Sequence, residues 1–178
     1  VGSEGVVVTS GDAGATWTTP GTGVITELNA VTWGNNRFVA VGANGTIITG
    51  STGSDWVQVD NQQNTVTLRG AAYGQFITTT SLTPVNVYVV VGDNGVVLRS
   101  ENGDEWAVQP QFTTQNLRGL VFGGRFVAVG DGGSIFTSPD GITWTQANSG
   151  TTADLTSVTR TLTGYTAVGE AGTNVSTF

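Results

Sequence analysis

The sequence contains no cysteine, histidine or methionine, and its six basic residues are all arginine, so lysine is absent too. Without cysteine and histidine the chain cannot form disulfides, zinc fingers, haem or iron–sulfur ligation, cysteine nucleophiles or histidine-based triads. Thirteen acidic residues give a formal net charge of −7 at pH 7 and a pI near 4.2. So few cations argue against nucleic acid or an anionic membrane as the main partner.

Long apolar runs are also missing. The longest, residues 87–91, includes a tyrosine, and a transmembrane helix needs about 20 apolar residues. We therefore predict no membrane insertion. Residues 1–4 have neither the basic start nor the apolar centre of a signal peptide. We expect a single domain, 1–178, that is a processed or excised product of an exported protein, located extracellularly, at the cell surface or in the periplasm.

A repeated pattern dominates what is present. The sequence Val-Gly-x-x-Gly occurs five times, with its first glycine at positions 2, 42, 92, 130 and 169, so the copies are 40, 50, 38 and 39 residues apart. A tryptophan follows each of the first four glycines after 15, 14, 14 and 14 residues. An insertion at residues 78–86 accounts for the single long step. Matched spacing of this kind indicates a structural repeat of about 40 residues.

Each repeat predicts four short strands. In residues 116–147 these are 117–122, 125–129, 134–138 and 142–146, separated by Gly, Asn and Asp. The pattern predicts an all-β fold, a β-propeller of about four four-stranded blades. The units are 1–20 (partial), 27–59, 66–109, 116–147 and 155–178 (partial). Either the N- and C-terminal strands share a blade and close the ring, or the chain is a segment of a larger propeller or assembly.

The tryptophans end a second motif. Residues 10–17 read S-x-D-x-G-x-T-W, residues 138–144 repeat it one residue shorter, residues 100–106 place asparagine at the Asp position, and residues 50–56 are degenerate. The motif residues are Ser10, Asp12, Gly14, Trp17, Trp56, Asn102, Gly103, Trp106, Ser138, Asp140, Gly141 and Trp144. The sequence thereby resembles the BNR/Asp-box β-propellers, which have the sialidase-type fold, and exported bacterial propellers similar to the photosystem II assembly factor family.

We interpret these motifs as structural. The aspartate accepts backbone N–H bonds within the turn, the glycine adopts a conformation that other residues resist, and the tryptophan is expected to be buried between neighbouring sheets. The resemblance implies that these turns lie on the face opposite the ligand site. Trp33, which lies outside the motif, is equivalent to Tyr73 and Phe122, so we expect it to be a packing residue.

The resemblance also raises the question of catalysis. Sialidases use an arginine triad, a Tyr–Glu nucleophile pair, an Asp acid/base and an F/Y-R-I-P segment, and this chain has no such segment. Arg37 and Arg125 are equivalent positions of the repeat, as are Arg69 and Arg118. These arginines therefore indicate repeat elements, and we predict no catalytic residues.

The Val-Gly-x-x-Gly turns carry a further set of polar residues, which we expect on one face of the propeller. They are Glu4, Asn44, Asp93, Asp131 and Glu170. Such a ring would suit a cationic partner or Ca²⁺, with Asp93 and Asp131 as candidate ligands. The alternative is that Asp, Asn and Glu are simply residues that tight turns accept. The sequence indicates no firm metal site and no other cofactor.

The insertion at residues 78–86 is expected to protrude on the face of the Asp-box turns. It is a tolerated loop, a contact between subunits or an O-glycosylated Thr/Ser segment at residues 78–83. The function that we predict is a non-catalytic, exported structural or protein-interaction module with a protein partner or self-association. The alternatives are a glycan-binding, lectin-like propeller and, less favoured, a sialidase-like glycoside hydrolase.

Overall fold

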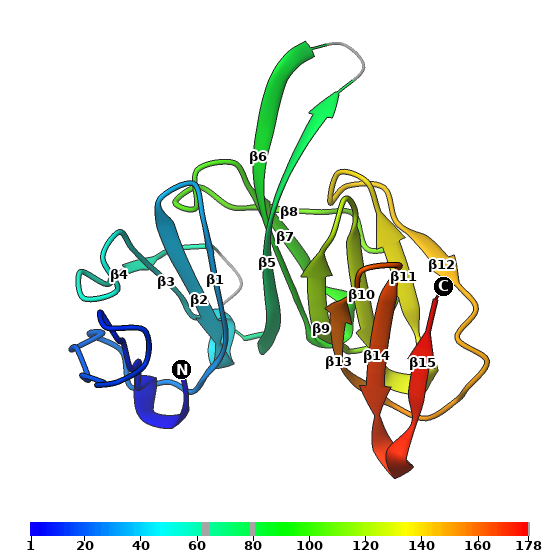
Figure 1. The fold of residues 1–178 in the computed structure, drawn as a ribbon, viewed down its shortest axis with the longest axis horizontal. Coiled ribbons are helices and arrows are strands. Elements are labelled where there is room, and N and C mark those ends of the chain that lie inside the picture. The colour runs from blue at the N-terminus through cyan, green and yellow to red at the C-terminus, as the bar shows by residue number, and fades with distance from the viewer. Residues whose placement is uncertain (62–64, 79–80, 178) are drawn as a thin grey trace.

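The computed structural model describes residues 1–61, 65–78 and 81–177. They form four antiparallel sheets in sequence order, which confirms the all-β propeller predicted from the repeat (Figure 1). The first sheet contains β1 (Leu28–Gly34), β2 (Arg37–Gly42), β3 (Ile47–Gly50) and β4 (Val57–Val59). The second contains β5 (Leu68–Thr78), β6 (Ser81–Gly92), β7 (Val97–Ser100) and β8 (Ala107–Val108). The third contains β9 (Leu117–Phe122), β10 (Phe126–Gly130), β11 (Ile135–Ser138) and β12 (Thr145–Ala147). The fourth has three strands, β13 (Leu155–Arg160), β14 (Tyr165–Gly169) and β15 (Asn174–Ser176).

The last four Val-Gly-x-x-Gly sequences form the turns between the second and third strands of the four sheets, and the first copy forms the same turn at residues 1–5. Each contains a short 3₁₀ turn, such as Ala43–Gly45 or Asp93–Gly95. A Cβ on the first glycine, Gly42, would lie 1.8 Å from the carbonyl oxygen of Glu27, and a Cβ on the last glycine, Gly95, would lie 2.1 Å from that of Thr113. Gly95 also has a positive φ of 69°. Close backbone contact therefore explains why both glycines recur.

The core lies between the sheets. Between the first and second sheets, Val39, Val41 and Ile47 pack with Tyr88 and Leu98, all fully buried. Equivalent residues fill the space between the second and third sheets. They are Val87, Val89, Val91, Leu117, Phe126 and Ala128. Successive residues of a strand point to opposite faces, and the inner strands carry near-continuous apolar runs such as residues 87–91, so both faces of the middle sheets are apolar.

The two ends of the chain lie on opposite sides of the molecule (Figure 1). Residues 5–19, here called the N-terminal pair, contain an isolated bridge between Thr9 and Thr18, and Val7 packs on Leu28 and Ile48 of the first sheet. At the other end β14 pairs with β15, so the fourth sheet supplies its own third strand. Of the alternatives that the sequence leaves open, closure by pairing the two chain ends in one blade is therefore not the arrangement found among the described residues.

The insertion lengthens the hairpin of β5 and β6, which projects beyond the sheets (Figure 1). Tyr88 of β6 pairs with Ser100, where the Asp-box turn of this sheet begins, so the hairpin extends on the side of these turns as predicted. Residues 79–80 lie outside the described residues, and the subunit-contact and glycosylation hypotheses stay predictions. Among the described residues, no helix is long and apolar enough to cross a membrane.

Candidate functional site

The Asp-box turns are held by side-chain hydrogen bonds to the backbone. In the third sheet, Ser138 Oγ accepts the N–H of Gly141 at 2.8 Å, and Asp140 Oδ1 accepts those of Ile142 and Thr143 at 2.9 and 3.0 Å. The indole N–H of Trp144 donates to Gly141 O at 3.3 Å. Ser10, Asp12, Gly14 and Trp17 repeat this arrangement, with Thr16 as the residue bound by the carboxylate. Each polar group of the motif therefore has a structural task.

These bonds stabilise the ionised aspartates. Hydrogen bonds from the Thr16 hydroxyl, the Thr16 N–H and the Ser10 hydroxyl lower the pKa of Asp12 to about 2. Burial alone would raise the pKa of Asp140, but the N–H groups of Ile142 and Thr143 and the Ser138 hydroxyl lower it overall. Both carboxylates are therefore ionised at neutral pH and accept hydrogen bonds, and neither is held protonated as a general acid requires.

In the two divergent turns, at residues 100–106 and 50–56, other side chains accept backbone N–H bonds of the turn, as Asp140 does in the third sheet. The Asn102 carboxamide oxygen accepts the N–H groups of Asp104 and Glu105, both at 2.9 Å. In the turn at residues 50–56, Asp55 accepts the N–H of Ser51 at 2.9 Å and that of Thr52 at 2.7 Å. The Ser51 hydroxyl is the largest of the interactions that lower the pKa of Asp55. Sequence reasoning missed Asp55 because this acid precedes the tryptophan instead of following the serine.

The tryptophans differ in burial. Trp56, Trp106 and Trp144 are half-buried, and each indole N–H binds the carbonyl of its turn glycine. Trp17 is 61% exposed, so the prediction that this ring is buried between sheets was wrong. Trp33 is 47% exposed, so it packs on one side only. Trp106 and Trp144 pack on clusters shared with the preceding sheet, and Trp56 packs on one that includes Val7 of the N-terminal pair. Among the described residues, no sheet lies against the ring of Trp17 in this way. Trp33 does contact Phe38, at a ring-centroid distance of 4.2 Å.

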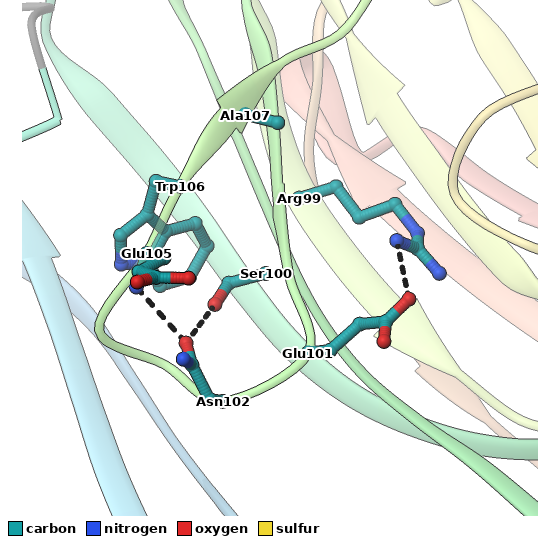
Figure 2. Close-up of a pocket in the computed structure, with 7 residues that line it drawn as sticks. All are labelled: Arg99, Ser100, Glu101, Asn102, Glu105, Trp106 and Ala107. Atoms are coloured by element: carbon teal, nitrogen blue, oxygen red, sulfur yellow. Dashed lines mark hydrogen bonds and ion pairs between the residues drawn. The ribbon is translucent and has the colours of Figure 1, made fainter.

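A shallow depression of about 560 Å³ lies at the turn of the second sheet. Figure 2 shows the Asn102 carboxamide turned toward Ser100 and Glu105, while Arg99 reaches Glu101 on the other side at 3.1 Å. Arg99 Nε also donates to the carbonyl of Asp140 in the next sheet at 3.2 Å. The polar groups of this depression are engaged in holding the turn, and the site offers no nucleophile with an adjacent base.

The acids of the Val-Gly-x-x-Gly turns do not form one ring of equivalent side chains. Asp93, Asp131 and Glu170 occupy the position after the first glycine, whereas Glu4 and Asn44 occupy the next one, with φ of 55° and 54°. The five residues therefore occupy two different positions of equivalent turns, and their role as a binding face stays a prediction.

Asp93 and Asp131 are both paired with arginines of their own sheets. Arg69 Nη2 lies 3.0 Å from Asp93 Oδ2, and Arg118 pairs with Asp131, which raises the pKa of Arg118. Asn116 Nδ2 donates to Asp131 Oδ2 at 2.8 Å. Among residues 1–61, 65–78 and 81–177, no three acids are grouped as a metal site requires. Ca²⁺ would compete with a guanidinium at each carboxylate, so these residues do not fit the ion.

A second cleft, of about 380 Å³, lies between the third and fourth sheets and is here called the arginine cleft. Its lining includes Gly123, Arg125, Arg160, Leu162 and Tyr165. The Tyr165 hydroxyl crosses between the sheets and donates to Gly123 O at 2.8 Å. The side chain of Arg160 lies over Gly123, where a Cβ would be 2.5 Å from Arg160 Cδ. Two guanidinium groups therefore line one cleft in an otherwise acidic protein.

No model of a protein family matches the sequence, and no curated protein matches it. Solved structures do match. YCF48 from Cyanidioschyzon merolae is 19% identical with a TM-score of 0.67, over 99% of this chain and 61% of that chain. YCF48 bound to D1 peptide is 16% identical with a TM-score of 0.61, over 82% of this chain and 47% of that one. The computationally designed Ika4 protein is 17% identical with a TM-score of 0.61, over 86% and 91% of the two chains.

This chain thus spans about half to three fifths of the YCF48 chains that it matches. At these identities the likeness concerns the fold, and it supports the β-propeller derived from the four sheets.

Proposed function

We propose that this chain is a non-catalytic, exported propeller of the Asp-box type that acts as a protein-interaction module. Its N-terminal end would bind an extended segment of a protein partner. The hydrogen bonds of the four turns support the Asp-box attribution, and the missing F/Y-R-I-P segment supports a role without catalysis. One solved propeller of this fold, YCF48, is bound to a D1 peptide, which supports peptide binding.

The exposure of Trp33 carries the proposal. Its equivalents are covered by the preceding sheet: Tyr73 lies on Gly34, and Phe122 lies on Gly74, where a Cβ would be 2.7 Å from Phe122 Cδ2. The N-terminal pair occupies the place of third and fourth strands, and the described residues place no inner strands beside it. Trp33 and Val31, 47% and 45% exposed, therefore face the position that inner strands would fill.

The N-terminal pair also offers a strand edge. In the first sheet, the third strand pairs with the second through Val39–Thr49 and Val41–Ile47. Within the described residues, the equivalent segment 6–9 pairs only through Thr9 and Thr18, and Val8 is 44% exposed. A partner segment that adds as a β-strand, with a glycine or other small residue over Trp33, would reproduce the contacts seen between the complete sheets. Exposed aromatic residues of this kind are typical anchors of protein interfaces.

A selection from a random peptide library displayed on phage tests this function. We expect enriched peptides that bind with micromolar Kd and lose at least tenfold in affinity to Trp33→Ser. The control Leu162→Ser changes a fully exposed apolar residue in the fourth sheet's hairpin and should leave affinity unchanged. Thermal melting confirms that both variants fold. No enrichment over background, or equal binding by Trp33→Ser, would contradict the proposal.

Exposed Trp17 and Trp33 also favour a second candidate function, glycan binding, because an accessible indole face can stack on a sugar ring. A glycan array separates the two functions. Binding to a defined sugar that Trp17→Ser or Trp33→Ser abolishes would favour the lectin-like alternative over the peptide.

A further inference from the structure

The depression at the turn of the second sheet contains a carboxylate without a partner. Of the charged side chains that line it, Arg99 pairs with Glu101 at 3.1 Å, which leaves Glu105. The backbone N–H of Glu105 donates to the Asn102 carboxamide, but its carboxylate forms no hydrogen bond or ion pair with another described residue. The lining therefore carries a net negative charge that no described residue neutralises.

Comparison with the other divergent turn shows why this carboxylate is left over. In the turn at residues 50–56, the acid before the tryptophan is Asp55, and it accepts backbone N–H groups of its own turn. Glu105 occupies the same position in the turn at residues 100–106, but there the Asn102 carboxamide accepts the N–H groups. The turn is thus complete without the Glu105 carboxylate. The first and third sheets flank the second, so both neighbouring sheets of this turn are present.

An indole ring of fixed orientation lines the same depression (Figure 2). The Trp106 N–H donates to Gly103 O at 3.0 Å, and one side of the ring packs against the core between the first and second sheets. The equivalent ring of Trp144 stacks on Phe112 at a centroid distance of 5.4 Å. Within the described part of the chain, Trp106 has no such aromatic neighbour. Its half-buried ring therefore offers aromatic surface beside the free carboxylate.

We propose that this depression binds an arginine side chain of a protein partner, with the Glu105 carboxylate and the Trp106 indole as its two binding groups. A guanidinium group donates paired hydrogen bonds to a carboxylate and also stacks on an aromatic face, so one arginine uses both groups. The depression is shallow, which suits a side chain that projects from another surface better than a small ligand that must be enclosed.

The arginine belongs to a different, basic protein. Two copies of this chain each carry a net charge of −7 and repel one another, whereas the same charge attracts a basic segment. The site deepens the proposed protein-binding function and rests on it, but it uses other residues than the peptide site at the N-terminal end. Glu105 and Trp106 belong to the turn of the second sheet and Trp33 to the first sheet, so each site can be tested separately.

The probe is the peptide acetyl-Gly-Arg-Gly-amide, titrated into the whole, isotope-labelled chain. NMR follows the indole N–H signals of the five tryptophans. The Trp106 signal should shift saturably with a millimolar Kd, and the signals of the exposed Trp17 and Trp33 should not follow the same curve. Glu105→Gln should weaken binding about fivefold, because the charge-assisted hydrogen bonds are lost. A peptide with citrulline in place of arginine keeps the shape without the charge and should also bind about fivefold more weakly.

The control is Glu4→Gln, which removes the same charge from an exposed turn and should leave binding unchanged. An unmoved Trp106 signal, equal weakening by Glu4→Gln, or equal binding of the citrulline peptide would overturn the proposal. A lysine peptide or free choline that binds more tightly than the arginine peptide would overturn the assignment to arginine. Trp33→Ser should not change the titration, so failure here and failure of the N-terminal peptide site are distinguishable.

A second copy as the source of the arginine gives a different result. The Trp106 signal would then shift with the concentration of the chain alone, and sedimentation would show a dimer that Glu105→Gln dissociates. That outcome would overturn the assignment to another protein. A monomer at every concentration, with a Trp106 signal that moves only when the peptide is added, is the result that we expect.

Discussion

Gly34 of β1 lies directly against the aromatic ring of Tyr73 in β5, so that a Cβ on this glycine would be 2.0 Å from Tyr73 Cγ. The glycine ends the inner strand of one sheet, and the tyrosine comes from the inner strand of the next. This contact allows the two inner strands to approach closely and places the Tyr88 hydroxyl on Gly34 O. The close spacing of the first and second sheets therefore depends on glycine at position 34, which has no side chain.

Gly34→Ala should lower the free energy of unfolding by about 1–3 kcal/mol, because the ring of Tyr73 must move to admit a methyl group. Urea denaturation followed by tryptophan fluorescence measures the change. Gly21→Ala is the matched control, since nothing lies within 4 Å of a Cβ at Gly21 and its φ is not in the left-handed region. An equal loss in both variants would show that packing against Tyr73 is not the cause.

Much of this architecture could be predicted from the repeat. The predicted strand at residues 117–122 coincides with β9, and the predicted third strand differs from β11 by one residue. The predicted fourth strand, 142–146, begins too early, because the N–H groups of Ile142 and Thr143 bind Asp140 and cannot enter a sheet. β12 begins at Thr145 for this reason.

The candidate sites were harder to predict from the sequence than the fold. The burial of a tryptophan depends on a neighbouring sheet, and the spacing that predicts Trp17 and Trp144 as equivalent says nothing about which of them has one. The motif likewise identified Arg37 and Arg125 as equivalent, but the pairing with Asp104 depends on contact between residues 67 positions apart. Such differences between equivalent positions of a repeat can be found only from the three-dimensional structure.

Asp12 should make the protein less stable in acid. Its pKa in the folded state is about 2, below the ordinary value of 3.8, so ionisation favours the folded state. This stabilisation is complete above pH 4 and is lost as the pH falls toward 2. In an NMR titration the carboxyl of Asp12 should change near pH 2. Thr16→Val removes the hydroxyl that contributes most and should raise this pKa toward 3.8, whereas an unchanged pKa would contradict the assigned cause.

Ser138 and Ser10 make the same bonds in different surroundings, which predicts unequal costs of removal. Ser138 is fully buried and accepts the N–H of Gly141 at 2.8 Å. Ser10 accepts that of Gly14 at the same distance, but in an exposed turn. Ser138→Ala should cost about 1–3 kcal/mol, because a buried N–H loses its acceptor. Ser10→Ala should cost less, because water replaces the hydroxyl. Chemical denaturation of both variants measures the difference, and equal costs would contradict it.

Trp17 and Trp144 end the same motif, yet their replacement by alanine should have different consequences. The ring of Trp144 stacks on Phe112 at a centroid distance of 5.4 Å and an interplanar angle of 18°, and Phe112 in turn packs on Phe136. Removing it leaves a cavity beside the core and should cost about 3 kcal/mol.

Among the described residues no sheet covers the outer side of Trp17, which is 61% exposed, so Trp17→Ala should change stability by no more than about 0.5 kcal/mol. Thermal and urea denaturation of the two variants measure this contrast. A loss of several kcal/mol in Trp17→Ala would show that its ring is covered in solution. A neutral result would show that the exposed face of this ring contributes little to folding and is accessible to a partner.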